Sequence, residues 1–300
     1  MRYVLAIFLF MFLAPQPTSA AGASLWDDLI SLTIQHVTKN GPDSEAAEFI
    51  DVACQHAWAR RTELVDLFVP YLKGDVPEEV AATLSVLYRF RGYRPISYMG
   101  DFEKANREFY DNLDQAVYAQ ISRILSLKDD RTYHSLALYL GVSRTADARR
   151  YLLEIAKSPA AGEAKEQALI CLAWHRDAND MDALLPFMLE DSPAARSLPY
   201  HFRNSYGPAA IPYLTKALTD AASSTARLQA AFELVHLRVR AGYTYLLDLL
   251  GKAPDMRSVQ SVRQFAIDYL GLPQSVKDKD AIAAHLKRLM EREPEDDAPQ

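Results

Sequence analysis

Residues 207–220 read GPAAIPYLTKALTD, and this stretch decides the fold because variants of it recur along the chain. Its apolar residues recur every three to four positions from Ile211 to Leu218, which is the spacing of one helical face. Pro212 is compatible with a helix that begins near Ala209, because the first N–H groups of a helix have no partner within it. The stretch therefore predicts an amphipathic helix with a proline in its first turn.

The recurring variants share an aromatic residue followed by an apolar one. The copies at residues 69–72 and 185–188 also keep the proline that marks the helix start. The aromatic markers lie 26 to 47 residues apart, and periods in this range are typical of arrays of helix pairs. The markers are Tyr71, Tyr118, Tyr151, Phe187, Tyr213 and Tyr245.

The partner helices of these pairs lie between the markers. Five segments are rich in Ala and Leu with helical periodicity, and Gly, Pro, Asp and Ser occupy the turns that separate them. The predicted partner helices cover residues 77–90, 131–142, 162–175, 224–239 and 256–271. The pattern therefore predicts an all-α chain.

Three of these segments carry a likeness to a known family. Residues 207–218 resemble the second helix of a HEAT repeat, and residues 166–173 and 226–235 resemble the first. The chain is thus similar to the HEAT-repeat family, more weakly over residues 45–272 as a whole. This resemblance implies an all-α, right-handed α-solenoid of about six to seven HEAT-like helix pairs, which share a continuous core. It implies a fold and not a function.

The N-terminal residues predict an export signal. Arg2 precedes an apolar run that ends at Ala14, and small residues lead up to Ala20. The run is too short to span a membrane. We therefore expect a periplasmic or extracellular protein with no transmembrane segment in its mature chain. The predicted segments are a signal peptide (1–20), a lead-in (21–44), a HEAT-like repeat domain (45–290) and an acidic, disordered tail (291–300).

Composition and cysteine positions limit the classes of function and cross-link. The chain has 33 basic and 39 acidic residues, a balance that argues against nucleic acid as a partner. Cys54 and Cys171 fall in predicted helices of different repeats. A disulfide requires Cα atoms within about 7 Å, so we expect none between them.

Residues 89–118 interrupt the period and predict an irregular insertion. This segment is rich in arginine and aromatic residues, which are enriched where proteins bind partners. In the alternative interpretation, the aromatic residues fill a junction between repeats and the arginines pair with Asp101, Glu103 and Glu108. The candidate partner-binding residues are Arg89, Arg91, Tyr93, Arg94 and Tyr98.

Other polar stretches are weaker candidates for a site. The acidic residues 175–182 do not fit the calcium loop of an EF-hand, and helix capping near Met181 accounts for them. Residues 197–207 suggest a polar rim or an ordinary repeat connection. Neither a close pair of histidines nor a nucleophile or phosphate-binding motif occurs. The sequence therefore identifies no catalytic residue, cofactor site or metal site.

Taken together, these patterns favour a non-catalytic binding or scaffolding protein that uses a helical-repeat surface for a protein partner. One alternative is an enzyme or enzyme accessory, because some proteins similar to HEAT repeats are lyases that act on tetrapyrroles. A second is a receptor for a small ligand or glycan, with Tyr93 and Tyr98 as stacking platforms. A third is an architectural spacer in an envelope assembly.

Overall fold

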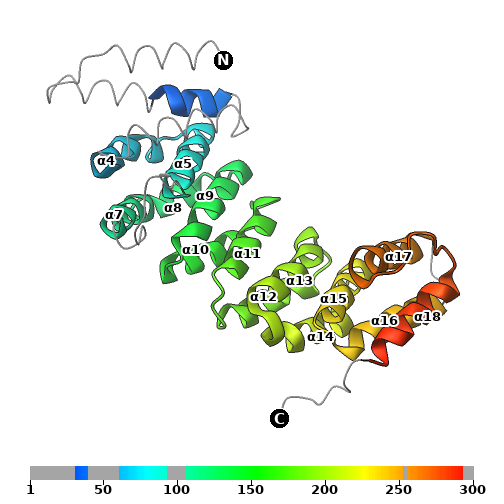
Figure 1. Cartoon of the computed structure of the whole chain (residues 1–300). Coiled ribbons are helices and arrows are strands. Elements are labelled where there is room, and N and C mark those ends of the chain that lie inside the picture. Colours follow the sequence, from blue (N-terminus) through cyan, green and yellow to red (C-terminus); the bar gives the residue numbers. More distant parts are fainter. Residues whose placement is uncertain (1–30, 40–60, 93–105, 253–255, 293–300) are drawn as a thin grey trace. The chain divides into compact units, whose positions relative to one another are not determined.

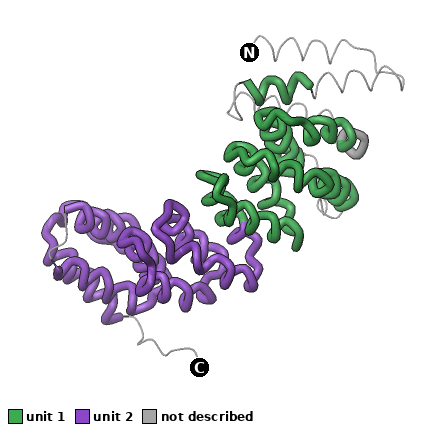
Figure 2. Tube along the Cα trace, turned by 180° about the vertical axis from the view of Figure 1, so that it is seen from behind, with its two compact units in different colours: residues 1–171 green, residues 172–300 purple. Residues whose placement is uncertain are grey.

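The computed structural model describes residues 31–39, 61–92, 106–252 and 256–292, with side chains omitted for 61–64. These residues are helical between short turns, and no strand occurs among them, which confirms the all-α class. The chain divides into two compact units, residues 1–171 and 172–300 (Figure 2). Within the described ranges, no helix is long and apolar enough to cross a membrane.

Unit 1 is organised around two long helices, α5 and α9, which pack against each other (Figure 1). α4 contacts α5 and α7, and α10 contacts α9. Residues 31–39 are helical. The later helices of this unit are α4 (Arg61–Leu72), α5 (Pro77–Gly92), α7 (Arg107–Tyr118), α8 (Ile121–Ser126), α9 (Asp130–Ser143) and α10 (Ala146–Lys157), followed by α11 (Ala164–Trp174), which continues into unit 2.

Unit 2 is organised around α15, which packs against α13, α14 and α16 (Figure 1). α18 contacts both α16 and α17. The elements after α11 are α12 (Asp180–Leu189), α13 (Pro193–Tyr206), the 3-10 helix η2 (Gly207–Ala210), α14 (Ile211–Asp220), α15 (Ser224–His236), α16 (Arg240–Gly251), α17 (Met256–Leu270) and α18 (Lys279–Met290).

Local chemistry explains where several helices begin. Asp129 accepts a hydrogen bond from the backbone N–H of Thr132 at the start of α9, and Thr145 caps α10 through Ala148 in the same way. Such caps satisfy N–H groups that have no partner within the helix. Ser192 likewise caps α13, and Pro193 follows it directly, as prolines do at helix starts.

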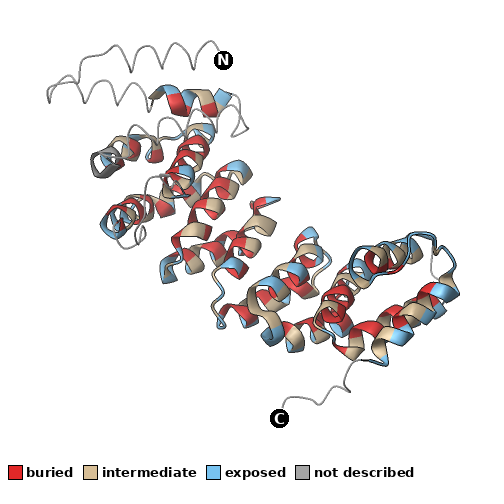
Figure 3. Cartoon of the chain, viewed as in Figure 1, coloured by how far each residue is buried: buried red, intermediate tan, exposed pale blue. Residues whose placement is uncertain are grey.

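The core of each unit consists of aliphatic and aromatic stripes along the helices (Figure 3). In the stretch that decided the fold, Leu214 and Leu218 are buried.

Close approach between helices depends on small residues. At Gly242 on α16, a Cβ atom would lie 2.7 Å from the carbonyl oxygen of Ala231 on α15, so only glycine permits this contact.

The structure corrects three details of the sequence interpretation. Pro212 does lie at the start of its helix, but Pro70 lies near the end of α4 and Pro186 in the interior of α12. Residues 197–206, interpreted as a polar rim or a repeat connection, belong to helix α13. The predicted insertion is also not irregular throughout, because residues 107–118 form α7 and bury one face against the core.

Candidate functional site

The predicted partner-binding residues fall in different settings. Tyr93, Arg94 and Tyr98 lie outside the described residues. Arg89 and Arg91 both lie in the last turn of α5, but Arg89 is exposed whereas the side chain of Arg91 is only 10% exposed. The two arginine side chains therefore lie in different environments, that of Arg89 in solvent and that of Arg91 in the protein interior.

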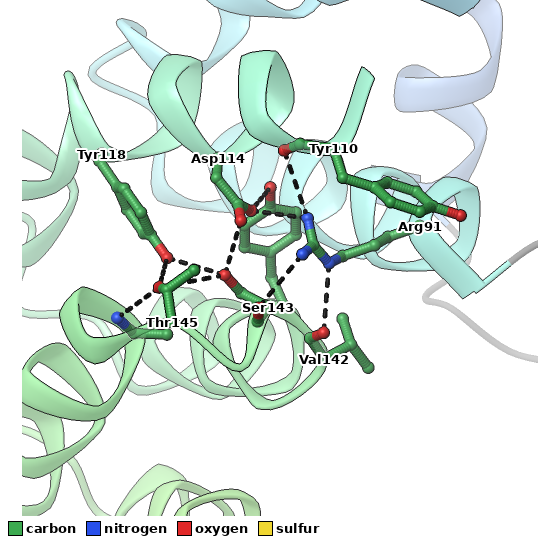
Figure 4. Close-up of polar contacts among 9 residues, drawn as sticks. Arg91, Tyr110, Asp114, Tyr118, Val142, Ser143 and Thr145 are labelled. Atoms are coloured by element: carbon green, nitrogen blue, oxygen red, sulfur yellow. Dashed lines mark hydrogen bonds and ion pairs between the residues drawn. The ribbon is translucent and has the colours of Figure 1, made fainter. Parts of the chain in front are cut away.

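Arg91 directs its guanidinium group into unit 1 (Figure 4). Its Nη1 forms an ion pair with Asp114 Oδ1 at 2.7 Å. Its Nε and Nη2 donate to the backbone oxygens of Val142 and Ser143, each at 3.3 Å. Its Cζ also lies 4.9 Å from the ring centroid of Tyr110. These contacts tie the end of α5 to α7 and α9.

The Asp114 carboxylate is the centre of this group (Figure 4). Oδ1 accepts from the Tyr139 hydroxyl and Oδ2 from Ser143 Oγ, both at 2.7 Å. The Tyr118 hydroxyl extends the network to Ser143 Oγ at 2.8 Å and Thr145 Oγ1 at 2.6 Å. We call Arg91, Asp114, Tyr118, Tyr139, Ser143 and Thr145 the Asp114 cluster.

The pKa values of the side chains in the Asp114 cluster are shifted by burial. Burial raises the pKa of Asp114 above its ordinary value, although Arg91 and the two hydroxyl donors oppose this shift. Burial also raises the pKa of Tyr139 well above 10.0. Arg91 forms an internal ion pair, which is the kind of role that the alternative interpretation gave to the arginines of this segment. Its partner, however, is Asp114 of α7 rather than one of the three carboxylates expected from the sequence.

A second gathering of aromatic and charged side chains lies in unit 2 and is open to solvent. It forms a groove with a volume of about 530 Å³ between side chains of α13, α15 and α17. These three helices are labelled in Figure 1, and they alternate along the chain with the shorter helices α12, α14 and α16. We call this feature the unit 2 groove.

The groove is lined at equivalent positions of the three helices, 32 residues apart. Ser197, Gln229 and Ser261 occupy the first of these positions. One helical turn later come Tyr200, Phe232 and Gln264, and directly after them His201, Glu233 and Phe265. Residues three and four apart share a helical face, so each helix presents the same face to the groove.

Aromatic rings form two groups in the groove. Phe232 and Phe265 stack with their centroids 4.2 Å apart, and Tyr269 continues the series from Phe265 at 5.4 Å. Tyr200 packs edge-on to His201 at 5.2 Å. The two phenylalanines are nearly buried, whereas Tyr200 and Tyr269 are 49% and 64% exposed.

His236 supports these rings from α15. It lies edge-on to Phe265 at 5.1 Å and to Tyr269 at 4.7 Å. Burial lowers the pKa of His236, and the nearby Arg203 lowers it further. The imidazole is therefore mostly neutral at pH 7.

Charged side chains in and beside the groove are held by local contacts. Glu233 is buried, and its Oε2 accepts a hydrogen bond from Nε of Arg203. Burial raises the pKa of Glu233 against the opposing effect of this guanidinium. On α17, Asp268 Oδ1 accepts from Gln264 Nε2 at 2.8 Å. Arg196 lines the groove as an exposed residue.

The sequence analysis interpreted residues 197–207 as a polar rim or a repeat connection, and it did not assign them to a helix that aligns with α15 and α17. Two signals were available. Ser192 and Pro193 form a typical helix start, and Ala194, Leu198 and Phe202 follow with helical spacing. The 32-residue alignment of α13, α15 and α17 would then have placed Tyr200 and His201 beside their counterparts.

The described residues give no support to a metal site. They contain no group of three or more His, Cys, Asp or Glu side chains placed to hold an ion. In the acidic turn, Asp177 accepts from the backbone N–H of Asn179 at 3.0 Å, and α12 begins at Asp180. The predicted helix start is confirmed, but Asn179 makes no capping bond through its side chain.

Cys171 is a buried free thiol. Burial raises its pKa to about 11. Cys54 lies outside the described residues, so the absence of a bridge between the two cysteines stays a prediction.

No family model, curated protein or solved structure matches this chain. Its function therefore has to follow from the geometry of the chain itself. Of the two gatherings of polar and aromatic residues, the Asp114 cluster is closed by its own contacts. The unit 2 groove presents exposed rings and hydrogen-bonding groups, and it is the better candidate for binding.

Proposed function

We propose that this protein is an exported, non-catalytic binding or scaffolding protein of the helical-repeat kind, with the unit 2 groove as its binding site. One observation carries the proposal. Three alternate helices, α13, α15 and α17, place aromatic and hydrogen-bonding side chains at positions 32 residues apart, all lining one groove. A repeated helical face is the surface that α-solenoids use for binding.

The exposure of the groove tyrosines supports this proposal. Tyr200 and Tyr269 keep about half or more of their area in solvent, next to a stacked pair of phenylalanines. Tyrosine supplies a large contact area at a low conformational cost, and it is enriched at binding surfaces. The HEAT-like resemblance and the expected export signal agree with a receptor or scaffold that works outside the cytoplasm.

A position-specific cross-linking experiment tests the groove as the binding site. A photo-reactive phenylalanine replaces Tyr200 in one variant and Arg89 in a second, so that the groove is compared with the exposed end of the predicted insertion. Both variants are expressed in the native envelope and irradiated. We expect a cross-linked adduct from position 200 that is weakened when Tyr269 is also changed to alanine.

The control outcomes separate the two candidate surfaces. An adduct from position 89 alone would place binding at the predicted insertion and overturn the assignment of the groove. No adduct from either position would overturn the binding role for both surfaces. Circular dichroism of each variant confirms that the helices remain folded.

The proposed export is tested on the mature N-terminus. We expect mass spectrometry of the protein purified from the envelope fraction to find a chain that begins at Ala21, after cleavage following Ala20. A full-length chain recovered only from the cytoplasm would contradict export.

A further inference from the structure

We infer that the unit 2 groove binds a neutral, hydroxyl-rich chain, that is, a segment of an oligosaccharide. This inference rests on the proposed function, because it names the class of ligand for the same groove. The charge, the hydrogen-bonding groups and the rings that line the groove each support it.

The charges in and beside the groove balance. Arg196 lines the groove together with Glu233 and Asp268, and Arg203 forms an ion pair with Glu233. Two cations therefore face two carboxylates, and His236 is mostly neutral at pH 7. Binding partners have complementary electrostatic potentials at their interface. A surface without net charge favours an uncharged ligand over a phosphate-rich or strongly basic one.

The hydrogen-bonding groups suit hydroxyls. Ser197, Gln229 and Ser261 lie at equivalent positions of the three helices. The hydroxyls of Ser197 and Ser261 donate to the backbone oxygens of Ala194 and Arg257 in their own helices, so they offer acceptors to a ligand, whereas the Gln229 amide both donates and accepts. The Gln264 and Asp268 pair adds a donor and acceptor next to each other on α17. A sugar hydroxyl also donates and accepts, so it can pair with every one of these groups. A ligand without hydrogen-bonding groups would cover the Gln229 amide without giving it a partner, at a cost of about 1–3 kcal/mol.

The apolar part of the groove consists of rings alone. No aliphatic side chain occurs among the residues that line it. An amphipathic helix or an aliphatic peptide would find no complementary surface of leucine, isoleucine or valine. A pyranose ring has a flat face of C–H groups, and this face can pack on the exposed rings of Tyr200 and Tyr269.

The size of the groove agrees with a short segment of such a chain. Its volume of about 530 Å³ lies within the range of about 300–1,000 Å³ that is usual for small-ligand sites. A folded protein partner needs about 800 Å² of buried surface on each side, which requires a wider area than this groove. The geometry therefore favours a slender chain that crosses α13, α15 and α17.

Binding is tested with purified mature protein and an array of neutral and charged glycans of defined composition. Neutral ligands found on the array are then titrated by calorimetry at low and high salt. We expect binding that depends little on salt, and a loss of about tenfold or more in affinity for Tyr200→Ala and for Tyr269→Ala. Gln229→Ala should weaken binding as well.

Tyr245→Ala is the matched control, because Tyr245 is a half-buried tyrosine on α16 that does not line the groove. We expect this variant to bind like the wild type, and thermal unfolding checks that all four variants are folded. Intrinsic fluorescence gives a second measurement, since Trp174 lies 6.2 Å from the ring of His201.

Three outcomes would overturn the inference. If no neutral glycan binds but position 200 still cross-links to a protein, the ligand class is wrong and the proposed function survives. If only charged glycans bind, with strong salt dependence, the charge argument is wrong. If neutral glycans bind equally to the wild type and to the groove variants, the groove is not their site. The absence of groove-dependent binding to glycan or protein would overturn both proposals.

Discussion

Arg91 in unit 1 and Arg203 in unit 2 have nearly the same neighbours and different roles. Each forms an ion pair with a carboxylate and lies over a tyrosine ring, Arg91 with Asp114 and Tyr110, and Arg203 with Glu233 and Tyr200. The Arg91 side chain is 10% exposed and the Arg203 side chain 24%. The comparison teaches that arginine and aromatic content alone does not separate an interior cluster from a solvent-exposed surface, whereas the exposure of the side chains does.

The two arginines also differ in how many internal bonds they make. Arg91 uses its Nε and both Nη atoms on four acceptors from α7 and α9. Arg203 donates only to Glu233 within the described part of the chain. The Asp114 cluster is therefore a structural tie between helices, while the Arg203 pair holds one wall of an open groove.

The largest expected effect is the loss of the centre of the Asp114 cluster. Asp114→Ala would leave the Arg91 guanidinium and the Tyr139 hydroxyl without their acceptor in the interior. We expect the free energy of unfolding to fall by about 3–5 kcal/mol, measured by urea denaturation followed by circular dichroism. Asp147→Ala, which removes an exposed ion pair with Arg150, is the control and should change stability little. Equal effects of the two variants would show that the cluster is not a structural tie.

A smaller effect is expected in the helix contact that supports the groove. In Gly242→Ala, the new Cβ would approach the Ala231 oxygen at 2.7 Å and Leu234 Cβ at 2.9 Å, so α16 must move away from α15. We expect a destabilisation of about 1–3 kcal/mol. Gly251→Ala lies on the same helix and has no atom within 4 Å of its new Cβ, so it should be neutral or slightly stabilising. Similar values for both variants would contradict the close approach.

The pH dependence of stability compares the buried carboxylate of Glu233 with an exposed one. Burial raises the pKa of Glu233 above 4.5, so the folded state holds this proton more tightly than the unfolded state does. The stability due to Glu233 is therefore present at low pH and is lost as the pH rises above 4.5. Glu233→Gln resembles the protonated side chain, and we expect it to gain stability relative to the wild type between about pH 4 and 7.

Asp220→Asn is the control of opposite sign for this measurement. Hydrogen bonds from Lys216 and Thr219 lower the pKa of Asp220 below 3.8, so its stabilisation is lost as the pH falls. This variant should lose stability relative to the wild type as the pH rises. If Glu233→Gln followed the same direction, the attraction of Arg203 would outweigh burial, and the pKa of Glu233 would be lowered rather than raised.

The smallest effect concerns the rate at which a thiol reagent labels Cys171, and no change in the free energy of unfolding is expected. Cys171 is buried with a pKa of about 11, so its thiol is protonated and inaccessible at neutral pH. In a Cys54→Ser background, we expect a thiol reagent to label Cys171 slowly in the folded protein and quickly in urea. Rapid labelling without urea would show that α11 opens in the native state.

Helix positions were largely predictable, because helices depend on local spacing. The segment 224–239 predicted α15 and the segment 256–271 predicted α17 within a few residues. The failures have physical causes. Pro186 lies inside α12 although proline removes a backbone donor, and its neighbours Leu184, Phe187 and Met188 are buried. α13 was missed because its polar residues hid an apolar face of Ala194, Leu198 and Phe202.

The sequence by itself determined that the described chain is helical, since apolar spacing within about 15 residues is a local property, and it predicted helix pairs that recur at an irregular period of 26 to 47 residues. Only the tertiary structure decided that Arg91 lies in the interior while Arg89 faces solvent. It also decided that Tyr200, Phe232 and Phe265 line one groove. The physical reason is that burial depends on contacts between helices far apart in the chain, and a local pattern does not encode which faces meet.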